Sequence, residues 1–250
     1  MENTDQLSTS IIYRDGHSTD NELSVISEHE LSVIVNERPV YRLICTKDHL
    51  KELIIGRLLS DGLIEDADDI SRLLFCKYEN EASVFLKHEI QWKEKISKEA
   101  TCCTGNKTFL SSGDNTKLKQ LPECEIRPEW IFSLTEEFGK DAGLHKNTGG
   151  THICILGRQG KVEFKCEDIG RHNAIDKAIG YALLYQIPLK DCMLFTSGRV
   201  PVDMVEKVIA AGSPVLISKS VPTLQSAELA GKYGLHLICK AWPDKYVLIS

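Results

Sequence analysis

The sequence predicts an α/β protein that consists of a small N-terminal α+β subdomain and a larger C-terminal α/β domain. In the N-terminal half, short segments in which residues alternate between two faces, as in strands, precede one stretch whose apolar residues recur at helical spacing. From Thr151 onward, short apolar strands alternate with amphipathic helices, a pattern typical of a layered helix–sheet–helix domain. With 250 residues, 42% hydrophobic and 26% charged, the chain can bury a substantial core. These proportions argue against collagen-like, wholly disordered and membrane-bundle proteins.

The N-terminal half divides into a tail and the small subdomain. Residues 1–27 are rich in Ser, Thr, Asp and Asn without sustained periodicity, which predicts a loose tail. The subdomain is expected over residues 28–98. Its predicted elements are a hairpin (31–35 and 40–45), a helix capped by Thr46 and ended by Asp61-Gly62, and strands near 70–78 and 82–90.

Residues 99–125 lack strong periodicity and have the composition of a long loop and linker, a kind of segment that is usually functional or disordered. The C-terminal domain is expected over residues 126–250 and begins with a helix at 128–138, where Pro128 suits a first helical position. Its other expected elements are strands at 151–156, 161–167, 192–196, 214–218 and 235–240 and helices at 173–185, 202–211 and 223–233.

Charge and cysteine usage narrow the functional class. The formal net charge is −6, with −9 over residues 1–148 and +3 over residues 149–250. A mildly basic C-terminal half suits an anionic ligand, but it is far from the basic stripe of a nucleic-acid binder.

No apolar run approaches the length of a membrane helix. Most of the nine cysteines lie in apolar runs, as expected for core residues of a cytoplasmic protein.

Polar, glycine-containing clusters occur at several predicted strand ends. They are residues 148–152, 167–173, 196–199 and 218–223. Because ligands of such sheets bind where loops leave the carboxyl ends of strands, these clusters are expected to converge on one crevice.

Three of these clusters pair a small residue with a base at a helix start, namely Gly170-Arg171, Gly198-Arg199 and Ser218-Lys219. Backbone N–H groups at a helix N-terminus together with a basic side chain form an anion site, so we infer a phosphate-bearing ligand. Each cluster also has a simpler interpretation. Gly149-Gly150 can be only a turn, and Asn173, Ser220 and Thr223 can be only helix caps.

Zinc chemistry and thiol chemistry each require characteristic residues. A zinc deaminase needs a His-x-Glu or Cys-x-Glu element and a Pro-Cys-x-x-Cys element, and this sequence contains neither, so no protein-ligated metal is expected. Cys102 and Cys103 lie in a polar context near Lys98 and Lys107, which would favour the thiolate form. They are the natural nucleophile candidates, although both can also be incidental loop thiols.

With these clusters identified, the sequence resembles the formate dehydrogenase accessory sulfurtransferase family (FdhD/NarQ) over residues 28–240. The run Glu167–Lys177 is long and unusual, which makes the resemblance specific. The matching stretches are Val33–Asn36 with Pro39, residues 46–64, Thr148–His152, Glu167–Lys177, Thr196–Arg199, Ala211–Pro214 and Ser218–Thr223.

The resemblance implies a three-layer, cytidine-deaminase-like larger domain without the zinc site, and a homodimer. It further implies a carrier that takes a cysteine persulfide from a cysteine desulfurase. The sulfur passes to the bis(guanine dinucleotide) molybdenum cofactor, which is bound as substrate before its insertion into formate dehydrogenase. Nucleic acid and membrane are not expected partners. The residues expected to bind the cofactor are Gly149, Gly150, His152, Asp168, Gly170, Arg171, His172, Asn173, Lys177, Ser197, Gly198, Arg199, Ser218, Lys219, Ser220 and Thr223.

The sequence departs from the family at the cysteine loop. The family's usual Cys-Gly-x-Cys-Gly is replaced by Thr101-Cys-Cys-Thr-Gly-Asn-Lys107. Aligning Lys107 with the lysine that often follows that loop favours Cys102 as the sulfur carrier, and a one-residue gap favours Cys103 instead. One persulfide is chemically enough for transfer. The alternative is a cofactor-binding chaperone that moves no sulfur.

Overall fold

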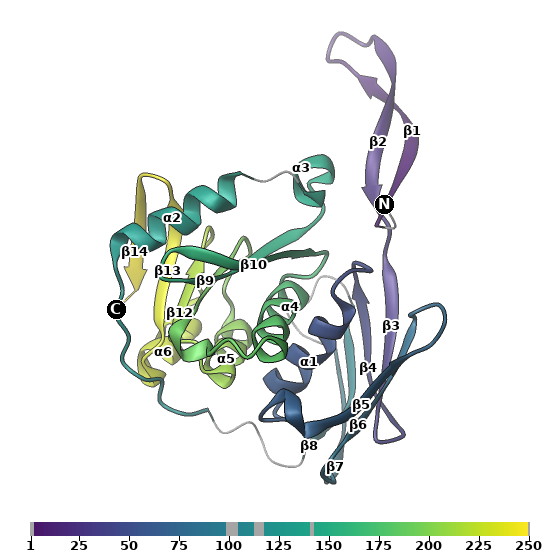
Figure 1. Ribbon diagram of the computed structural model, residues 1–250. Coiled ribbons are helices and arrows are strands. Elements are labelled where there is room, and N and C mark those ends of the chain that lie inside the picture. Colours follow the sequence, from purple (N-terminus) through teal and green to yellow (C-terminus); the bar gives the residue numbers. More distant parts are fainter. Residues whose placement is uncertain (1–2, 99–104, 113–117, 141–142, 250) are drawn as a thin grey trace.

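The computed structural model describes residues 3–98, 105–112, 118–140 and 143–249. Two subdomains, each built on its own six-stranded sheet, lie side by side, and a long two-stranded hairpin projects from them (Figure 1). Cys102 and Cys103 lie outside the described residues. The expected mixed α/β fold with a small N-terminal and a larger C-terminal part is confirmed. No helix within the described ranges is long and apolar enough to cross a bilayer.

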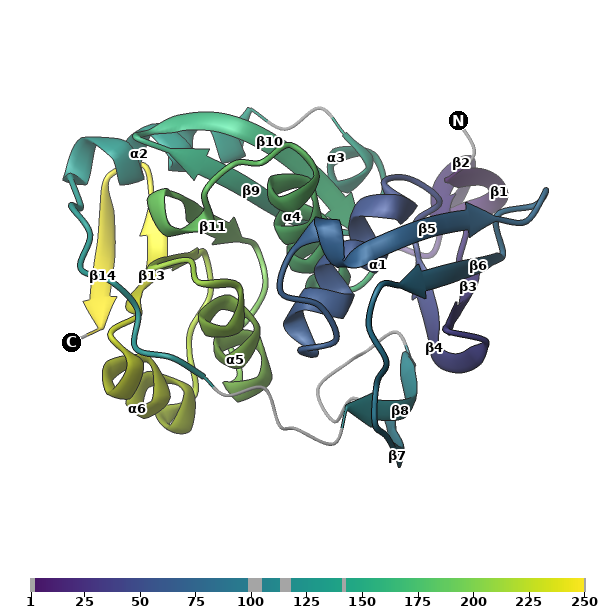
Figure 2. The same ribbon diagram turned by 60° about the horizontal axis from the view of Figure 1, so that its bottom comes forward.

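The small subdomain is a mixed sheet with one helix packed on it (Figure 2). The strand order is β5-β6-β3-β4-β8-β7, and helix α1 (Leu50–Ser60) buries its apolar residues against strands β3 and β4. The strands are β3 (His29–Val35), β4 (Arg38–Cys45), β5 (Ile70–Phe75), β6 (Glu81–Leu86), β7 (Trp92–Lys98) and β8 (Lys107–Ser112), and a short 3-10 helix, η1, spans Ala67–Asp69. The expected hairpin and the two following strands are therefore present.

The larger domain has three layers. Its sheet runs in the order β10-β9-β11-β12-β13-β14, with helix α2 packed on one face and helices α4, α5 and α6 on the other. The strands are β9 (His152–Arg158), β10 (Lys161–Asp168), β11 (Met193–Thr196), β12 (Val215–Ser218), β13 (His236–Trp242) and β14 (Lys245–Ile249). The helices are α2 (Pro128–Gly139), α3 (Leu144–Thr148), α4 (Arg171–Leu184), α5 (Val202–Ala211), α6 (Leu224–Tyr233) and the 3-10 helix η2 (Leu189–Asp191).

Helices α1 and α4 join the two subdomains at a crossing where only glycine fits. A Cβ atom on Gly56 would lie 1.8 Å from the carbonyl oxygen of Asp176, and one on Gly180 would lie 1.9 Å from the carbonyl oxygen of Glu52. Such distances are far inside van der Waals contact, so the two helix backbones touch directly. We call this contact the seam.

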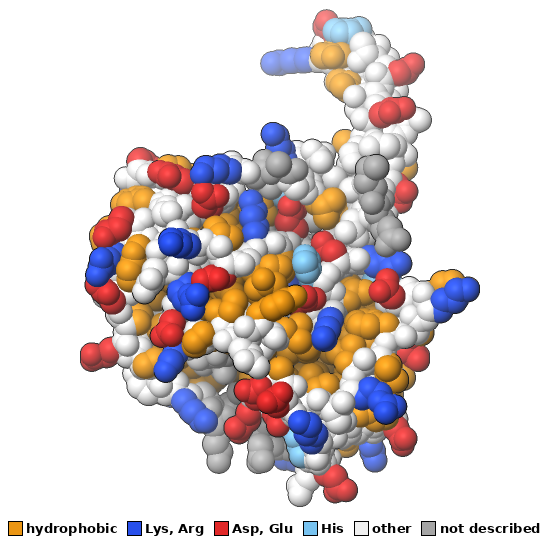
Figure 3. All heavy atoms as spheres, in the orientation of Figure 1, with side chains coloured by type: hydrophobic (Ala, Val, Ile, Leu, Met, Phe, Trp, Pro, Cys, Tyr) orange, Lys and Arg blue, Asp and Glu red, His pale blue; other side chains and the backbone are white. Residues whose placement is uncertain are grey.

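The N-terminal segment is not the loose tail that its composition predicted. Strands β1 (Thr4–Ile12) and β2 (Ser18–Ile26) pair antiparallel over nine residues each. Leu7 pairs with Leu23 on one face of this ribbon, while Gln6, Ser8 and Ser10 lie on the other. The apolar side chains remain largely exposed (Figure 3). Polar residues dominate the segment, so its sequence shows little of the alternation of apolar and polar residues that identifies a strand.

Three further expectations need correction. The expected loop over residues 99–125 contains strand β8, which pairs with β7. Helix α3 and strand β14 are two elements that the sequence pattern did not predict. Thr46 does not cap α1. The helix begins after His49, which has a left-handed backbone (φ 50°), and the Thr46 hydroxyl donates instead to Asp48.

Candidate functional site

The four polar clusters meet at one end of the large sheet, as their positions predicted. Asp168 at the end of β10 pairs with His152 at the start of β9, and Thr196 at the end of β11 pairs with Ser218 at the end of β12. Strand β9 runs antiparallel to β10 and β11, so its first residues lie beside the last residues of its neighbours. The clusters therefore lie together at the carboxyl ends of β10, β11 and β12, the edge at which sheets of this kind bind ligands. We call this edge the crevice.

Helix α4 starts at this crevice. The Asp168 carboxylate accepts the backbone N–H of Gly170 at 2.9 Å, which folds the short turn into the helix. Arg171, the first helical residue, is only 6% exposed. Gly198 from the β11 loop lies against it, since a Cβ atom there would be 2.9 Å from the Cβ of Arg171. The absence of a side chain at position 198 thus brings two loops together over a buried guanidinium.

His152 and Ser197 link the first strand to the β11 loop. The Ser197 hydroxyl lies 3.1 Å from His152 Nδ1 and accepts the backbone N–H of Ile153 at 3.1 Å. Burial, reinforced by the nearby positive charge of Arg171, lowers the pKa of His152. The imidazole is therefore neutral at physiological pH and becomes cationic more readily when an anion is close.

The β12 loop supplies a partly buried lysine. The Ser218 hydroxyl donates to the carbonyl oxygen of Gly198 at 2.7 Å, which closes the β11 and β12 loops on each other. Lys219 Nζ lies 4.7 Å from the ring centroid of Phe138 and 4.5 Å from that of Trp242. Burial lowers the pKa of this lysine. Trp242 is 45% exposed and was not among the predicted site residues.

Several predicted ligand-binding side chains are internal instead. Lys177 is fully buried, and its Nζ lies within 3.1 Å of four oxygens, those of the Thr46 hydroxyl, the Asp48 and Asp168 carboxylates and the Glu167 carbonyl. An ammonium group donates three hydrogen bonds, so these neighbours saturate it. Lys177 therefore ties strand β10 to the residues that precede α1 and does not face a ligand.

Asp168, His172 and Asn173 are likewise buried, with exposures of 0%, 1% and 0%. His172 Nε2 lies 3.1 Å from an Asp203 carboxylate oxygen, and the Asn173 amide donates to Asp168 at 2.8 Å. These three side chains are therefore not accessible to a ligand at the crevice.

The half-exposed or exposed members of the predicted set are Gly149, Gly150, His152, Ser197, Arg199, Lys219, Ser220 and Thr223. Of these, Thr223 caps α6, as the simpler interpretation proposed.

Asn106 is a residue that the sequence interpretation did not single out. It is 1% exposed and follows directly after Gly105, at the end of the segment that contains Cys102 and Cys103. Its side-chain Oδ1 accepts the Ile44 N–H at 2.9 Å, and its Nδ2 donates to Asn173 Oδ1 at 2.8 Å. An isolated asparagine in a loop is typical of a turn, so the sequence carried no signal for this contact.

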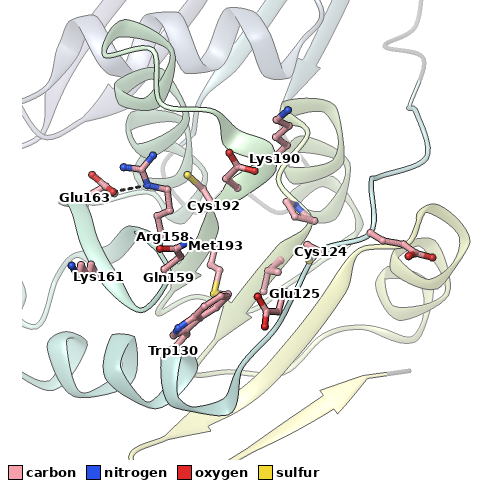
Figure 4. A pocket seen from close by; sticks show the side chains of 14 residues that line it. Cys124, Glu125, Trp130, Arg158, Gln159, Lys161, Glu163, Lys190, Cys192 and Met193 are labelled. Carbon is pink, nitrogen blue, oxygen red and sulfur yellow. Dashed lines mark hydrogen bonds and ion pairs between the residues drawn. The ribbon is translucent and has the colours of Figure 1, made fainter.

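A cavity of about 570 Å³ lies at the opposite end of the sheet, near the β9–β10 turn (Figure 4). Its lining includes Cys124, Cys192 and the Arg158–Glu163 ion pair of 2.8 Å. Burial raises the pKa of Cys192 to about 12 and also raises that of Cys124. Both thiols therefore stay protonated at neutral pH and are poor nucleophiles.

Comparison with known proteins agrees with this arrangement. A model of the FdhD/NarQ family matches residues 26–249, which include the small subdomain, the seam and every cluster at the crevice. The chain belongs to the FdhD/NarQ family. The projecting hairpin, β1 and β2, lies almost entirely before the matched region.

Two relatives illustrate how much of the chain this family covers. The sulfur carrier protein FdhD of Bacillus pumilus is 35% identical over 222 residues, which are 87% of this chain and 85% of the relative. That of Bacillus licheniformis is 32% identical over 230 residues, 90% of this chain and 88% of the relative.

The fold recurs in a crystal structure of a candidate formate dehydrogenase accessory protein from Desulfotalea psychrophila. The superposition has a TM-score of 0.81 with 22% sequence identity, and covers 99% of this chain and 97% of that one. The two-subdomain α/β architecture is therefore shared.

Proposed function

We propose that this protein is a sulfur carrier that supplies sulfur to a molybdenum cofactor before the cofactor enters formate dehydrogenase. Membership of the FdhD/NarQ family and relatives named sulfur carrier protein FdhD support the carrier role. The partners would be a cysteine desulfurase as sulfur donor, formate dehydrogenase as recipient and a second copy of this chain in a cytoplasmic homodimer.

The loading step needs one nucleophilic thiolate. A thiolate of Cys102 or Cys103 attacks the terminal sulfur of the persulfide on the desulfurase. A new S–S bond forms on the carrier, the old S–S bond breaks, and the desulfurase cysteine leaves as a thiolate. No external oxidant or reductant is consumed.

The observation that carries this proposal is the position of Asn106. Its side chain is bonded to Asn173 near the start of α4, beside the crevice. Cys103 precedes it by three residues and Cys102 by four. Three residues of fully extended chain span at most about 10 Å and four residues about 14 Å. Covalent connectivity alone therefore limits how far either thiol can lie from Asn106.

The crevice suits a substrate with pyrophosphate groups, such as a bis(guanine dinucleotide) cofactor. Arg171 and the N–H groups at the start of α4 offer positive potential, and Arg199 and Lys219 stand on the adjacent loops. Gly149 and Gly150 are exposed and leave room for close approach of a phosphate. Two dinucleotide halves carry several negative charges, which such a rim would bind by charge-assisted hydrogen bonds.

Mass spectrometry tests the carrier function directly. Incubation with a cysteine desulfurase and cysteine should add the mass of one sulfur atom to Cys102 or Cys103. Cys102→Ala, Cys103→Ala and the double variant should separate the two thiols, with Cys124→Ala as the matched control at the opposite end of the sheet.

The double variant is expected to lose activation of formate dehydrogenase in cells while binding GDP and melting like the wild type. Full activation by the double variant would disprove sulfur transfer by these thiols. It would favour the alternative that the protein is a chaperone for the cofactor.

A further inference from the structure

The hairpin formed by β1 and β2 has one apolar and one polar face. Leu7 lies opposite Leu23, and side chains along a strand alternate between the two faces. The carboxylates of Asp20 and Glu22 lie on the polar face. The apolar face comprises Asp5, Leu7, Thr9, Ile11, Thr19, Asn21, Leu23 and Val25. Leu7 is 51% exposed, so this face is open to water. We call this hairpin, Thr4–Ile26, the arm.

The arm lacks a layer to pack against. It projects away from both subdomains (Figure 1). Within the described residues its contact with the body is near its base, where α3 packs against β2 and Gly150 lies close to Ile26. A two-stranded hairpin alone is at best marginally stable in water and needs a further layer on its apolar face. We therefore expect a surface outside the subdomains of the same chain to cover the arm.

A second uncovered apolar surface lies on the large domain. The rings of Phe164 on β10 and Tyr181 on α4 stack with 3.9 Å between their centroids, and the ring of Tyr185 continues the row at 4.3 Å from Tyr181. Tyr185 and the nearby Val162 are exposed. Figure 3 shows apolar side chains gathered between β10 and α4 at the front of the view. We call these four residues the aromatic row. Contiguous exposed apolar side chains of this kind mark interaction surfaces.

The charges of the two surfaces are complementary. The arm carries four acidic side chains and one basic side chain, a net charge of −3. Residues 149–250, which include the aromatic row, carry +3. Two arms would therefore repel each other, whereas an arm and a large domain attract each other.

The area of the arm leads to the same choice. A strand of nine residues is about 30 Å long and two paired strands are about 10 Å wide, so one face covers about 300 Å². Two arms packed face to face would bury about 600 Å² in total, well below the roughly 1,200 Å² of a stable interface. An arm docked on the body of a second copy forms two such contacts by symmetry, which together bury about 1,200 Å².

We propose that the arm of one copy docks by its apolar face on the aromatic row of a second copy, and that two-fold symmetry repeats the contact. The inference rests on the homodimer of the proposed function and names its surfaces. Leu7 and Leu23 would pack against the rings of the row. Tyrosine is enriched at the energetic centres of interfaces, because its rigid ring buries much apolar area while its hydroxyl stays in water.

Substitutions on the arm test the first surface. Leu7→Asp should raise the dissociation constant of the dimer, measured by sedimentation over a range of protein concentrations. A tenfold weakening of each contact acts twice in the dimer, so the expected change is about a hundredfold. Leu7→Thr removes most of the apolar area but keeps a strong strand former, and should weaken the dimer in the same direction. Gln6→Asp adds the same charge to the polar face and is the matched control, with an expected change below about twofold.

Substitutions on the row test the second surface. Tyr185→Ala should also weaken the dimer about a hundredfold, because it too acts in both contacts. Tyr78→Ala is the matched control. Tyr78 is 72% exposed and Tyr185 61%, but Tyr78 lies between β5 and β6 in the small subdomain. Its removal should leave the dimer unchanged. Circular dichroism should show the same secondary structure in both variants.

A mixture of two variants tests whether these surfaces meet. In a mixed dimer of Leu7→Asp and Tyr185→Ala chains, the intact arm of one chain faces the intact row of the other. One contact is then wild type, and both substitutions fall in the second contact. Native mass spectrometry distinguishes the chains by mass, and the mixed dimer should form about tenfold more tightly than either variant dimer.

Four results would overturn the proposal. A wild-type protein that is monomeric at micromolar concentration has no such interface. Equal dimerisation of Leu7→Asp and Gln6→Asp would place the arm outside the interface. A normal dimer of Tyr185→Ala with a weakened dimer of Leu7→Asp would place the arm against a second arm or another protein. Mixed and variant dimers in the statistical ratio would show that arm and row do not meet.

The carrier function is tested separately. Leu7→Asp should still accept sulfur from a desulfurase. A wild type that dimerises as expected, and whose dimer the arm and row substitutions weaken, would support the docking proposal even if it accepts no sulfur. That last result would contradict the carrier function alone.

Discussion

The seam and the rim of the crevice contain similar residues, glycines next to lysines and arginines, yet use them in opposite ways. At the seam, Gly56 and Gly180 admit a neighbouring backbone, and the buried Lys177 is saturated by protein oxygens. At the rim, Gly149 and Arg199 are exposed. The conspicuous run Glu167–Lys177 is therefore mostly buried and mainly holds the fold together, and the residues available to a ligand come mainly from loops outside it.

Buried ion pairs complete the seam. The Asp176 carboxylate accepts two bonds of 2.9 Å from Lys207 of α5 and one of 2.9 Å from Ser60 of α1. Burial raises the pKa of Asp176, and the positive charge of Lys207 offsets part of that effect. Charges enclosed in this way stabilise only as complete sets, because removal of one member leaves another buried and unpaired.

The largest expected effect is at the helix crossing. Gly56→Ala or Gly180→Ala should destabilise the fold by about 5 kcal/mol, because α1 and α4 must move apart to admit the new methyl group. Urea denaturation would measure the change. Gly231→Ala in α6 is the matched control. Nothing lies within 4 Å of a Cβ atom there, so it should be neutral or slightly stabilising. Equal stability of all three variants would refute the direct backbone contact.

Lys177→Met comes next. It leaves the Asp168 and Asp48 carboxylates without their shared cation, and we expect a loss of about 3 kcal/mol. GDP affinity, measured by calorimetry well below the melting temperature, should change by less than about twofold, because the ammonium does not face the crevice. A selective loss of GDP binding with normal stability would instead place Lys177 in the ligand site.

At the rim the effect should be on binding alone. Arg199→Ala should weaken GDP binding roughly tenfold by removing one charge-assisted contact, with an unchanged melting temperature. Arg158→Ala, which removes another partly exposed arginine at the far end of the sheet, serves as the control and should bind GDP normally. Identical affinities for the two variants would move the anion site away from the β11 loop.

The smallest effect concerns His152. Its pKa in the free protein is lowered, so a bound anion should raise that pKa, and His152 should take up a proton on binding when the pH lies between the two values. GDP affinity should therefore gain from this group as pH falls through that window. An NMR titration of the His152 ring with and without GDP isolates the effect from the titration of the phosphate itself, which takes place near pH 6. An unchanged or lower pKa in the complex would show that the anion binds elsewhere.

Periodicity located much of the fold. Helix α5 has the predicted bounds, and the polar clusters meet as expected, because strand ends and helix starts are local signals. What the sequence left open depends on long-range packing. Lys177 and Asn173 are buried because they lie on the side of α4 that faces the small subdomain. No local sequence pattern shows which side of α4 this is. Trp242 lies on β13, the strand next to β12, and Asn106 contacts Ile44 of β4. Contacts between strands that are distant in the sequence cannot be predicted from the pattern of a single sequence.

The helix crossing also governs the order in which the protein can be made. Gly56 meets a helix whose own glycine, Gly180, follows about 120 residues later in the chain. At a synthesis rate of about 5 to 20 residues per second, the partner of α1 emerges roughly 6 to 25 seconds after α1 itself. During that interval the face of α1 around Gly56 has no partner helix to pack against. The small subdomain therefore acquires its partner helix only after α4 has been made, although it comes first in the sequence, and a premature stop before α4 would release a chain without this contact.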